Sequence, residues 1–163
     1  MINDKGLEIL KRYEGCSLDV YRDPIGIWTI GHGSCFSFDG DRVGMGHRKI
    51  TASEATVLLL RSCRQAENGI ARLVRVPLTD NQRSALISFV YNVGVGNFQR
   101  STMRMKLNRA SYEGAANEFW KWRRAGGRIL RGLVARRKSE ARLFRTISQK
   151  DSSPLGHPLV EVL

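Results

Sequence analysis

The sequence predicts an α+β domain in which a small β-containing lobe lies beside a larger, mainly helical lobe, with a cleft between them. Three observations predict it: a helix and a hairpin pattern over residues 4–33, a glycine-rich stretch over 40–50, and helical periodicity after that stretch. A chain of 163 residues suffices for one domain with a substantial core. We expect the β-containing lobe over about 13–50, the helical lobe over about 51–147 and a loosely ordered tail over 148–163.

The first helix is predicted over residues 4–14, because apolar residues recur three and four positions apart and Gly15 is a natural stop. The runs "LDVYR" and "IWTIGHG" read as two strands, and "DPIG" between them suits a type I turn. A hairpin is therefore expected from Leu18 to Gly33. The run "CFSFDGD" suggests a third short strand with Asp39-Gly40 as its turn.

Two capping boxes predict the starts of the next two helices. In "TASE" Thr51 stands three residues before Glu54, and in "LTDNQ" Thr79 stands three residues before Gln82. The first of these helices should run to about Ile70. The second continues through "SALISFVYNV", which is apolar nearly all round and is therefore expected to be central and buried.

Further helices are expected over about 101–107 and 112–123, before the glycines of "AGG" interrupt the chain at 125–127. The segment "GLVARRKSEARLFRTI" then predicts an amphipathic basic helix. Its expected core stripe consists of Leu133, Leu143, Phe144 and Ile147.

Charge narrows the classes of partner. Lysine and arginine number 27 against 15 acidic residues, a net charge of +12, which favours a polyanion such as nucleic acid, an anionic membrane or an acidic cell-wall polymer. The cysteines, Cys16, Cys35 and Cys63, are too few and of odd number for a disulfide framework, so reduced thiols are expected. No signal peptide or membrane span is predicted.

A possible pair of catalytic carboxylates lies around the hairpin. Glu14 stands at the negative end of the first helix, where the dipole disfavours a carboxylate and favours the protonated form of a general acid. Asp23 begins the turn nine residues later and could face Glu14 as a second carboxylate, with the Thr29 hydroxyl holding a water between them. Each residue also has an ordinary explanation: an exposed glutamate, a turn aspartate and a β-branched strand residue.

The pattern "YEG…Y-x-D-x-x-G-x-x-TIG-x-G" resembles the catalytic segment of the phage-type lysozymes, the endolysin family of glycoside hydrolase family 24. Its matching residues are Glu14, Gly15, Tyr21, Asp23, Gly26, Thr29, Ile30, Gly31 and Gly33. "LTDNQRSALISFVYNVGVGNFQRSTM" is similar to the family's central helix and "NEFWKWRRAGGRILRGLVARRKSEARLF" to its C-terminal segment, so the resemblance covers roughly residues 4–147. The C-terminal matches are Trp120, Gly126, Gly127, Gly132, Leu133, Arg136, Arg137, Glu140 and Phe144.

The resemblance implies a lysozyme-like fold and hydrolysis of the β-1,4 bond between N-acetylmuramic acid and N-acetylglucosamine in peptidoglycan. It implies Glu14 as general acid, Asp23 as second carboxylate and Thr29 as the hydroxyl that positions water. Family positions that contact substrate fall on Tyr91, Asn92, Ser101 and Arg123. An aromatic ring beside an amide suits an N-acetyl sugar, although Tyr91 on a buried helix also fits a core residue.

The run "GHGSC" departs from the family pattern. Ser34 stands where many relatives have histidine, and His32 lies between the two glycines, so His32 is assigned no role in catalysis. Some relatives regulate an active-site cysteine by redox chemistry. Unpaired thiols remain the expectation for Cys16 and Cys35.

Two alternatives to a muramidase stay open. A zinc amidase of the cell wall would need ligands from His32, His47, His157 and the cysteines, which show no paired metal-site spacing. A basic module that binds nucleic acid or membrane would explain the charge, but no nucleic-acid motif stands out. The basic C-terminal helix could also contact the outer membrane or its lipopolysaccharide, or be an ordinary solvated face.

For the muramidase we expect a monomer without cofactor or metal, peptidoglycan as its partner and no nucleic acid. Without a signal, the chain is expected in the host cytoplasm before lysis, from which a partner such as a holin would give it access to the periplasmic wall.

Overall fold

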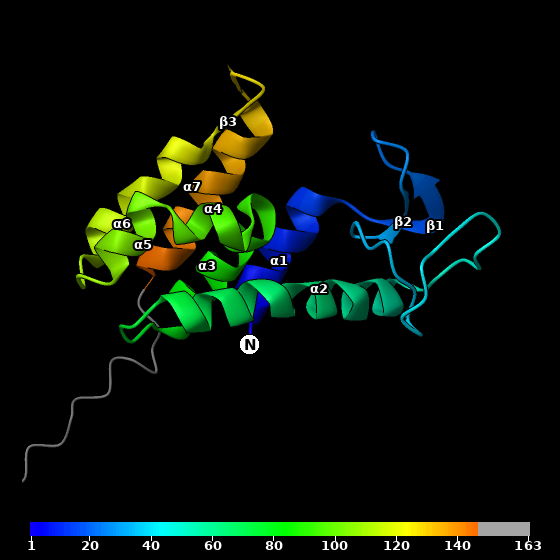
Figure 1. Cartoon of the computed structure of the whole chain (residues 1–163), viewed down its shortest axis with the longest axis horizontal. Coiled ribbons are helices and arrows are strands. Elements are labelled where there is room, and N and C mark those ends of the chain that lie inside the picture. The colour runs from blue at the N-terminus through cyan, green and yellow to red at the C-terminus, as the bar shows by residue number, and fades with distance from the viewer. Residues whose placement is uncertain (147–163) are drawn as a thin grey trace, which may run out of the picture.

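The computed structural model describes residues 1–146, and the predicted tail over 148–163 and Ile147 of the predicted core stripe lie outside them. The elements, in chain order, are α1 (Asp4–Glu14), β1 (Ser17–Arg22), β2 (Trp28–Gly31), α2 (Ala52–Leu73), α3 (Asp80–Val93), α4 (Val95–Gln99), α5 (Thr102–Leu107), α6 (Tyr112–Glu118), a 3-10 turn (Phe119–Trp122), β3 (Arg124–Ala125), β4 (Arg128–Ile129) and α7 (Arg131–Arg145). The predicted α+β class is confirmed: a small sheet lies at one end of a helical body (Figure 1). We call residues 15–50 the small lobe and α1 with residues 51–146 the helical lobe.

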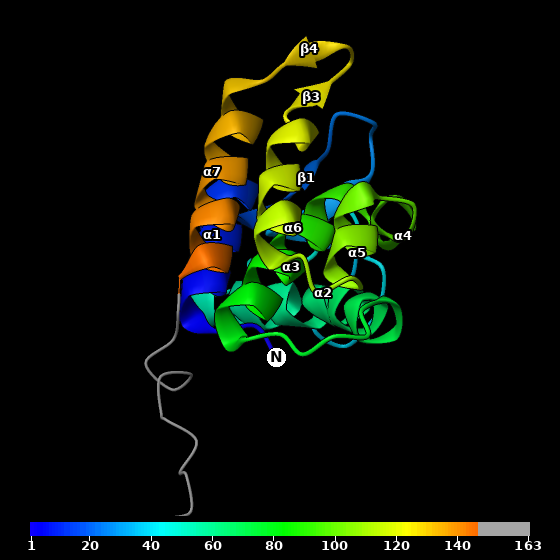
Figure 2. The same cartoon turned by 90° about the vertical axis from the view of Figure 1, so that its left-hand side faces the viewer.

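Helix α3 is the centre of the helical lobe, as its apolar sequence predicted. It packs against α1, α2, α4 and α7, and Figure 2 shows α1 and α7 side by side. Every residue from Ala85 to Val90 is buried. Phe89 makes edge-to-face contacts with Phe119 and Trp122, with ring centroids 5.2 and 5.5 Å apart, which ties α3 to the 3-10 turn after α6.

The small lobe is built on the predicted hairpin. Strands β1 and β2 pair antiparallel with Tyr21 opposite Thr29, and the Gly26 amide donates to the Asp23 carbonyl at 2.9 Å, which closes the turn. A second, smaller apolar core lies behind the hairpin. Its members are Ile30, Val43, Ile50, Ala55 and Leu58.

The predicted third strand is wrong. Over 35–41 the chain makes only an isolated bridge, between Phe36 and Arg42, and otherwise forms turns. Gly40 has a positive φ of 95°, and its amide donates to the Ser37 carbonyl at 3.2 Å. The tight turn around Gly40 leaves too few extended residues for a ladder.

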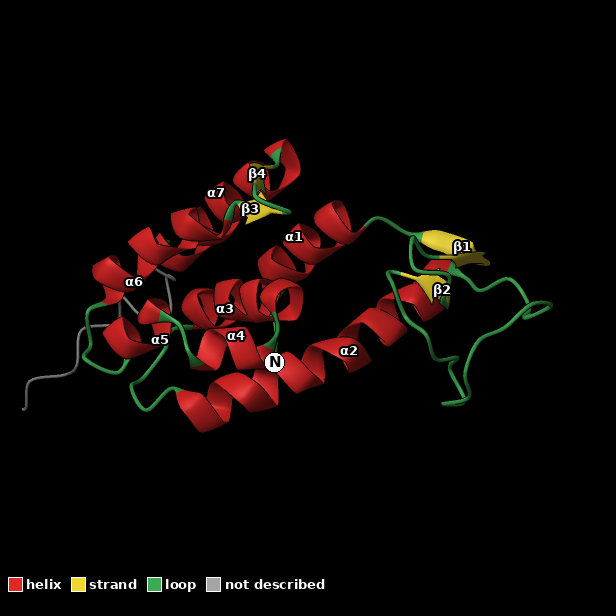
Figure 3. Ribbon diagram, turned by 45° about the horizontal axis from the view of Figure 1, so that its top comes forward, coloured by secondary structure: helices red, strands yellow, loops and turns green. Residues whose placement is uncertain are grey.

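Both capping boxes are confirmed. Thr51 accepts from the Glu54 amide and Thr79 from the Gln82 amide, and each side chain three residues on accepts from the backbone amide of its cap. Helix α2 continues three residues beyond the predicted end and runs beneath both lobes (Figure 3).

The glycine break after the 3-10 turn contains a feature that the sequence analysis missed. Gly126 and Gly127, both with positive φ, form the turn of a small hairpin between β3 and β4. The predicted helix over 112–123 ends early as α6 and finishes as the 3-10 turn. The predicted interruption at "GVGNF" contains the short helix α4.

Because the hydroxyl of Thr79 satisfies an amide at the start of α3, Thr79→Ala should lower the free energy of unfolding by about 1 kcal/mol. Thr56→Ala is the matched control, because Thr56 lies inside α2 and its hydroxyl only donates back to the Ala52 carbonyl. It should change stability by less than about 0.5 kcal/mol. Urea unfolding followed by circular dichroism measures both, and equal effects would show that the cap does not stabilise α3.

Candidate active site

Glu14, the predicted acid, is the last residue of α1, and the chain turns sharply after it. Gly15 has φ 69° and ψ −174°, a conformation that is essentially restricted to glycine. The Glu14 side chain is 22% exposed, and its Oε1 accepts a hydrogen bond from Arg136 Nη1 at 2.6 Å. The carboxyl group is therefore half-buried and held by a cation from α7.

Arg136 belongs to a buried ion cluster that joins three helices. Its Nε donates to Glu140 Oε1 at 3.0 Å and its Nη2 to the Ser88 carbonyl at 3.0 Å. The Ser88 hydroxyl also donates to Glu140 Oε1, at 2.7 Å. Since Arg136 uses all three guanidinium nitrogens, its position relative to Glu14 is fixed by α3 and α7 together.

Arg137 is the second cation of this cluster. Its Nη1 lies 3.0 Å from Glu140 Oε2 without hydrogen-bond alignment, and its Nη2 donates to Asn92 Oδ1 at 2.5 Å. Burial lowers the pKa of Arg137 to about 10, although the charges of Glu140 and Glu14 oppose this. Burial also raises the pKa of Glu140, against the two arginines.

Asp23 occupies the turn between β1 and β2, as predicted. Its Oδ1 accepts from the amides of Ile25 and Ile27 at 3.0 and 2.8 Å. The other carboxylate oxygen accepts no hydrogen bond from residues 1–146. The turn therefore uses one oxygen of Asp23 and leaves the second available to a ligand.

Thr29 lies on β2 and is buried, with 4% of its surface exposed, and its hydroxyl donates to the Ile27 carbonyl at 3.1 Å. Its cross-strand partner Tyr21 responds to both candidate carboxylates. Burial raises the pKa of Tyr21, and the negative charges of Asp23 and Glu14 add to this shift. The hairpin thus places Tyr21, the cross-strand partner of Thr29, within electrostatic reach of both Asp23 and Glu14.

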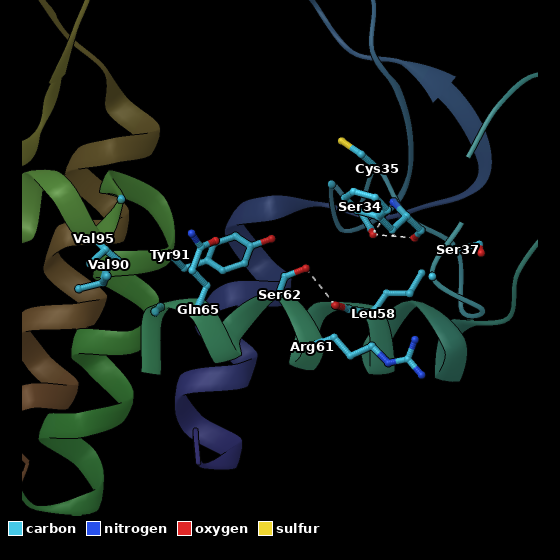
Figure 4. A pocket seen from close by; sticks show the side chains of 15 residues that line it. Ser34, Cys35, Ser37, Leu58, Arg61, Ser62, Gln65, Val90, Tyr91 and Val95 are labelled. Atoms are coloured by element: carbon cyan, nitrogen blue, oxygen red, sulfur yellow. Dashed lines mark hydrogen bonds between the residues drawn. The ribbon is translucent and has the colours of Figure 1, made fainter. Parts of the chain in front are cut away.

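A cleft of about 580 Å³ separates the two lobes next to these residues. Figure 4 shows Ser34, Cys35 and Ser37 of the small lobe across from Tyr91, with Ser62 of α2 between them and Gln65 of α2 beside Tyr91. Glu14, Asp23 and Thr29 are not among its lining residues. The cleft instead continues from the loop that directly follows β2, and it has the size and mixed polarity of a ligand site.

Of the four predicted substrate residues, only Tyr91 lines this cleft. Tyr91 lines the cleft, and burial raises the pKa of its hydroxyl, with the charge of Glu14 adding to the shift. Asn92 is exposed but uses its Oδ1 on Arg137. Ser101 is buried as the N-cap of α5, and Arg123 stacks on Trp120 at 4.3 Å, so neither lines this cleft.

Sequence reasoning gave no role to Arg136, Arg137 and Glu140, although Arg136 bonds Glu14 and Glu140 pairs with both arginines. A signal was present, because two arginines stand four and three positions before a glutamate, a spacing that pairs charges on one helix face. A basic helix is ordinarily read as solvated, and that reading placed these side chains outside the core.

No group of three or more histidine, cysteine or acidic residues within 1–146 could hold a metal ion. In that part of the chain, no helix has both the length and the apolar character to cross a membrane. The three cysteines are free, with Cys16 exposed, Cys35 half-buried and Cys63 buried.

Comparison with known proteins identifies the family of the chain. The family model for phage lysozyme matches residues 11–140. The endolysin of Salmonella phage P22 is 41% identical over 143 residues, which cover 88% of this chain and 97% of the relative. A mutant P22 lysozyme structure superposes with a TM-score of 0.82 at 39% identity over 90% of this chain and 99% of its own. The muramidase domain of SpmX from Asticaccaulis excentricus gives 0.78 at 31% identity over 90% and 99%. The chain therefore belongs to the phage lysozyme family, and its fold is lysozyme-like.

Proposed function

We propose that this chain is a muramidase that hydrolyses the β-1,4 bond between N-acetylmuramic acid and N-acetylglucosamine. As a phage lysozyme it is a peptidoglycan-degrading glycoside hydrolase of the endolysin type. The observation that carries the assignment of roles is the placement of Glu14, which is half-buried at the end of α1 and bonded to Arg136. Asp23 and Thr29, both on the hairpin that follows α1, are the proposed partners of Glu14.

In this mechanism Glu14 protonates the glycosidic oxygen and becomes a carboxylate. Arg136, already 2.6 Å from Oε1, stabilises the negative charge that this step creates. Arg136 also forms an ion pair with Glu140, so its positive charge is shared between Glu14 and Glu140.

Asp23 supplies the second carboxylate, on the small lobe. Its free oxygen can orient a water molecule or stabilise the positive charge that develops on the sugar ring. Thr29 donates to the Ile27 carbonyl, which leaves the lone pairs of its hydroxyl to accept from that water. These roles are those that the resemblance implied for the three residues.

The cleft fits a saccharide chain with acidic substituents. Tyr91 offers an aromatic ring, while Ser62 and Gln65 offer hydrogen-bonding groups. Arg61 also lines the cleft, stacks on Phe38 at 4.5 Å and adds a positive charge for an anionic polymer. Asn92, Ser101 and Arg123 remain proposed contacts for a longer substrate.

We further propose that the enzyme works as a monomer without a cofactor. Its site of action would be the periplasmic wall of a Gram-negative host, after synthesis in the host cytoplasm. The net charge of +12 supports attraction to an anionic wall polymer.

Glu14→Gln should reduce hydrolysis of purified peptidoglycan by at least about 10²-fold, because an amide cannot deliver the proton. New sugar reducing ends measure the rate, and circular dichroism checks the fold. Glu8→Gln, an exposed change on the same helix, is the matched control and should leave the rate unchanged. Full activity of the Glu14 variant would remove Glu14 from the mechanism.

The same assay separates the alternative functions. A zinc amidase would release peptide amines without reducing ends and would lose activity in EDTA. A nucleic-acid-binding module would bind DNA tightly and leave the polymer intact. We expect reducing ends that appear equally fast with and without EDTA.

Asp23→Asn should lower the rate by about 10²-fold or more while the turn survives, because an asparagine oxygen can accept the same two amides. This variant separates the chemical role of the carboxylate from its role in the turn. Asp39→Asn, in the exposed turn of the other small-lobe loop, is the control. A near-normal rate for the Asp23 variant would leave it as a turn residue only.

We also propose, independently of catalysis, that the exposed basic face of α7 contacts lipopolysaccharide in the outer membrane. Lys138 and Arg142 are exposed on this face and line a groove of about 660 Å³ beside Trp120. An aromatic ring among cations suits a phosphorylated glycolipid, because the cations can bind its phosphates and the ring can contact its apolar part.

A double variant, Lys138→Gln with Arg142→Gln, should weaken binding to phosphatidylcholine vesicles that contain lipopolysaccharide by about tenfold. Its rate on purified peptidoglycan should not change. Arg72→Gln with Arg109→Gln removes the same charge from exposed positions elsewhere. Equal weakening by both pairs would attribute the binding to net charge rather than to this face.

A further inference from the structure

His32, the histidine that departs from the family pattern, joins three elements of the site. It follows β2 directly and is buried, with 7% of its surface exposed. Its ring Nδ1 is hydrogen-bonded to the carbonyl of Gly15, at the end of α1. Its own carbonyl accepts a hydrogen bond from the Tyr91 hydroxyl of α3 at 3.4 Å. His32 therefore contacts both Gly15, the residue that caps α1, and Tyr91 of α3.

The partner of the ring defines which nitrogen carries a proton. A backbone carbonyl can only accept, so Nδ1 must be protonated and must donate to Gly15. The other nitrogen, Nε2, makes no hydrogen bond with the described residues 1–146. Within the described residues, the imidazole therefore makes its hydrogen bond through Nδ1.

The two residues joined by this bond lie close in sequence to two of the proposed catalytic residues. Gly15 directly follows Glu14, and His32 comes three residues after Thr29. The carbonyl of Gly15 reaches His32 because Gly15 adopts φ 69° and ψ −174°, which a residue with a side chain would avoid. Gly31 and Gly33, with φ of 65° and 97°, allow the backbone to turn tightly on both sides of His32.

Ser34 cannot replace His32 in this contact. Its hydroxyl donates to the Phe36 carbonyl at 2.7 Å and accepts from the Phe36 amide at 3.1 Å, so it closes a local turn. Of the two polar residues in "GHGSC", only His32 links the lobes.

We propose that His32 is a positioning residue, whose Nδ1–H bond to Gly15 fixes the Glu14 carboxyl relative to Thr29 and Asp23. This inference rests on the proposed roles of those three residues. The bond connects the end of the helix that carries the acid to the strand that carries the hydroxyl. Without this bond the two lobes remain folded, but the Glu14 carboxyl is no longer held at a fixed position relative to Thr29 and Asp23.

Amide substitutions test the geometry, because asparagine places its NH₂ near the position of Nδ1 and glutamine places it near Nε2. His32→Asn should keep kcat within about threefold of wild type. His32→Gln and His32→Leu should lower kcat by about 10²-fold with little change in KM, as expected when reacting groups shift by about 1 Å. Thermal unfolding of all variants identifies any loss that comes from global instability.

A double-mutant cycle provides a second measurement. Gly15→Ala strains the backbone that presents the carbonyl, so its effect on kcat should overlap with that of His32→Leu instead of adding to it. Nitrogen NMR of the wild type should show a proton on Nδ1 of His32, a readout that needs neither activity nor a variant.

Three results would overturn the proposal: His32→Gln retaining activity while His32→Asn loses it, additive effects in the cycle, or an unprotonated Nδ1. The first would mean that Nε2 acts in the cleft. Failure of the proposed function is a distinct outcome, because it appears as absent reducing ends in the wild type or as an active Glu14→Gln variant.

Discussion

Glu140 is a carboxylate with no exposed surface, and the architecture at the catalytic end of the helical lobe depends on how its charge is met. An unpaired buried charge costs several kcal/mol. Here Arg136, Arg137 and the Ser88 hydroxyl surround it from α7 and α3. With these partners in place, Arg136 has one nitrogen left, and that nitrogen reaches Glu14 on α1. The position of the acid is therefore a consequence of satisfying a buried glutamate.

The two lobes contribute different things to the site. The helical lobe supplies Glu14, the proposed acid, whose surroundings are packed and fully bonded on the Arg136 side. The small lobe supplies Asp23 on an exposed turn, where backbone amides hold the carboxylate and solvent or substrate can reach it. An acid and a water-activating group need such contrasting environments, one dry and one wet.

Local signals explain what the sequence could predict. Capping boxes at Thr51 and Thr79, the Asp23 turn and the apolar run of α3 are all set by neighbours within a few residues. The roles of Glu14, Asp23 and Thr29 came from family resemblance, since each residue alone has an ordinary explanation.

What escaped prediction depends on contacts far apart in the chain. Arg136 meets Glu14 across 122 positions, and the spacing of the two arginines before Glu140 pairs their charges without showing that these side chains are buried. The bond from His32 to Gly15 likewise joins residues 17 positions apart and depends on an unusual glycine conformation. The third strand failed for a local reason, because the tight turn around Gly40 leaves only an isolated bridge between Phe36 and Arg42.

Helix α2 spans 22 residues, or about 33 Å, and its side chains enter both apolar cores. Ala55 and Leu58 complete the small core, while the very next residue, Leu59, belongs to the large one. The small core has too few members to fold alone. If the small core unfolded alone, it would expose the start of α2, which the larger core holds in place. The two lobes should therefore unfold in one cooperative transition. A molecule whose work requires a cleft between lobes thus retains the thermodynamics of an undivided domain.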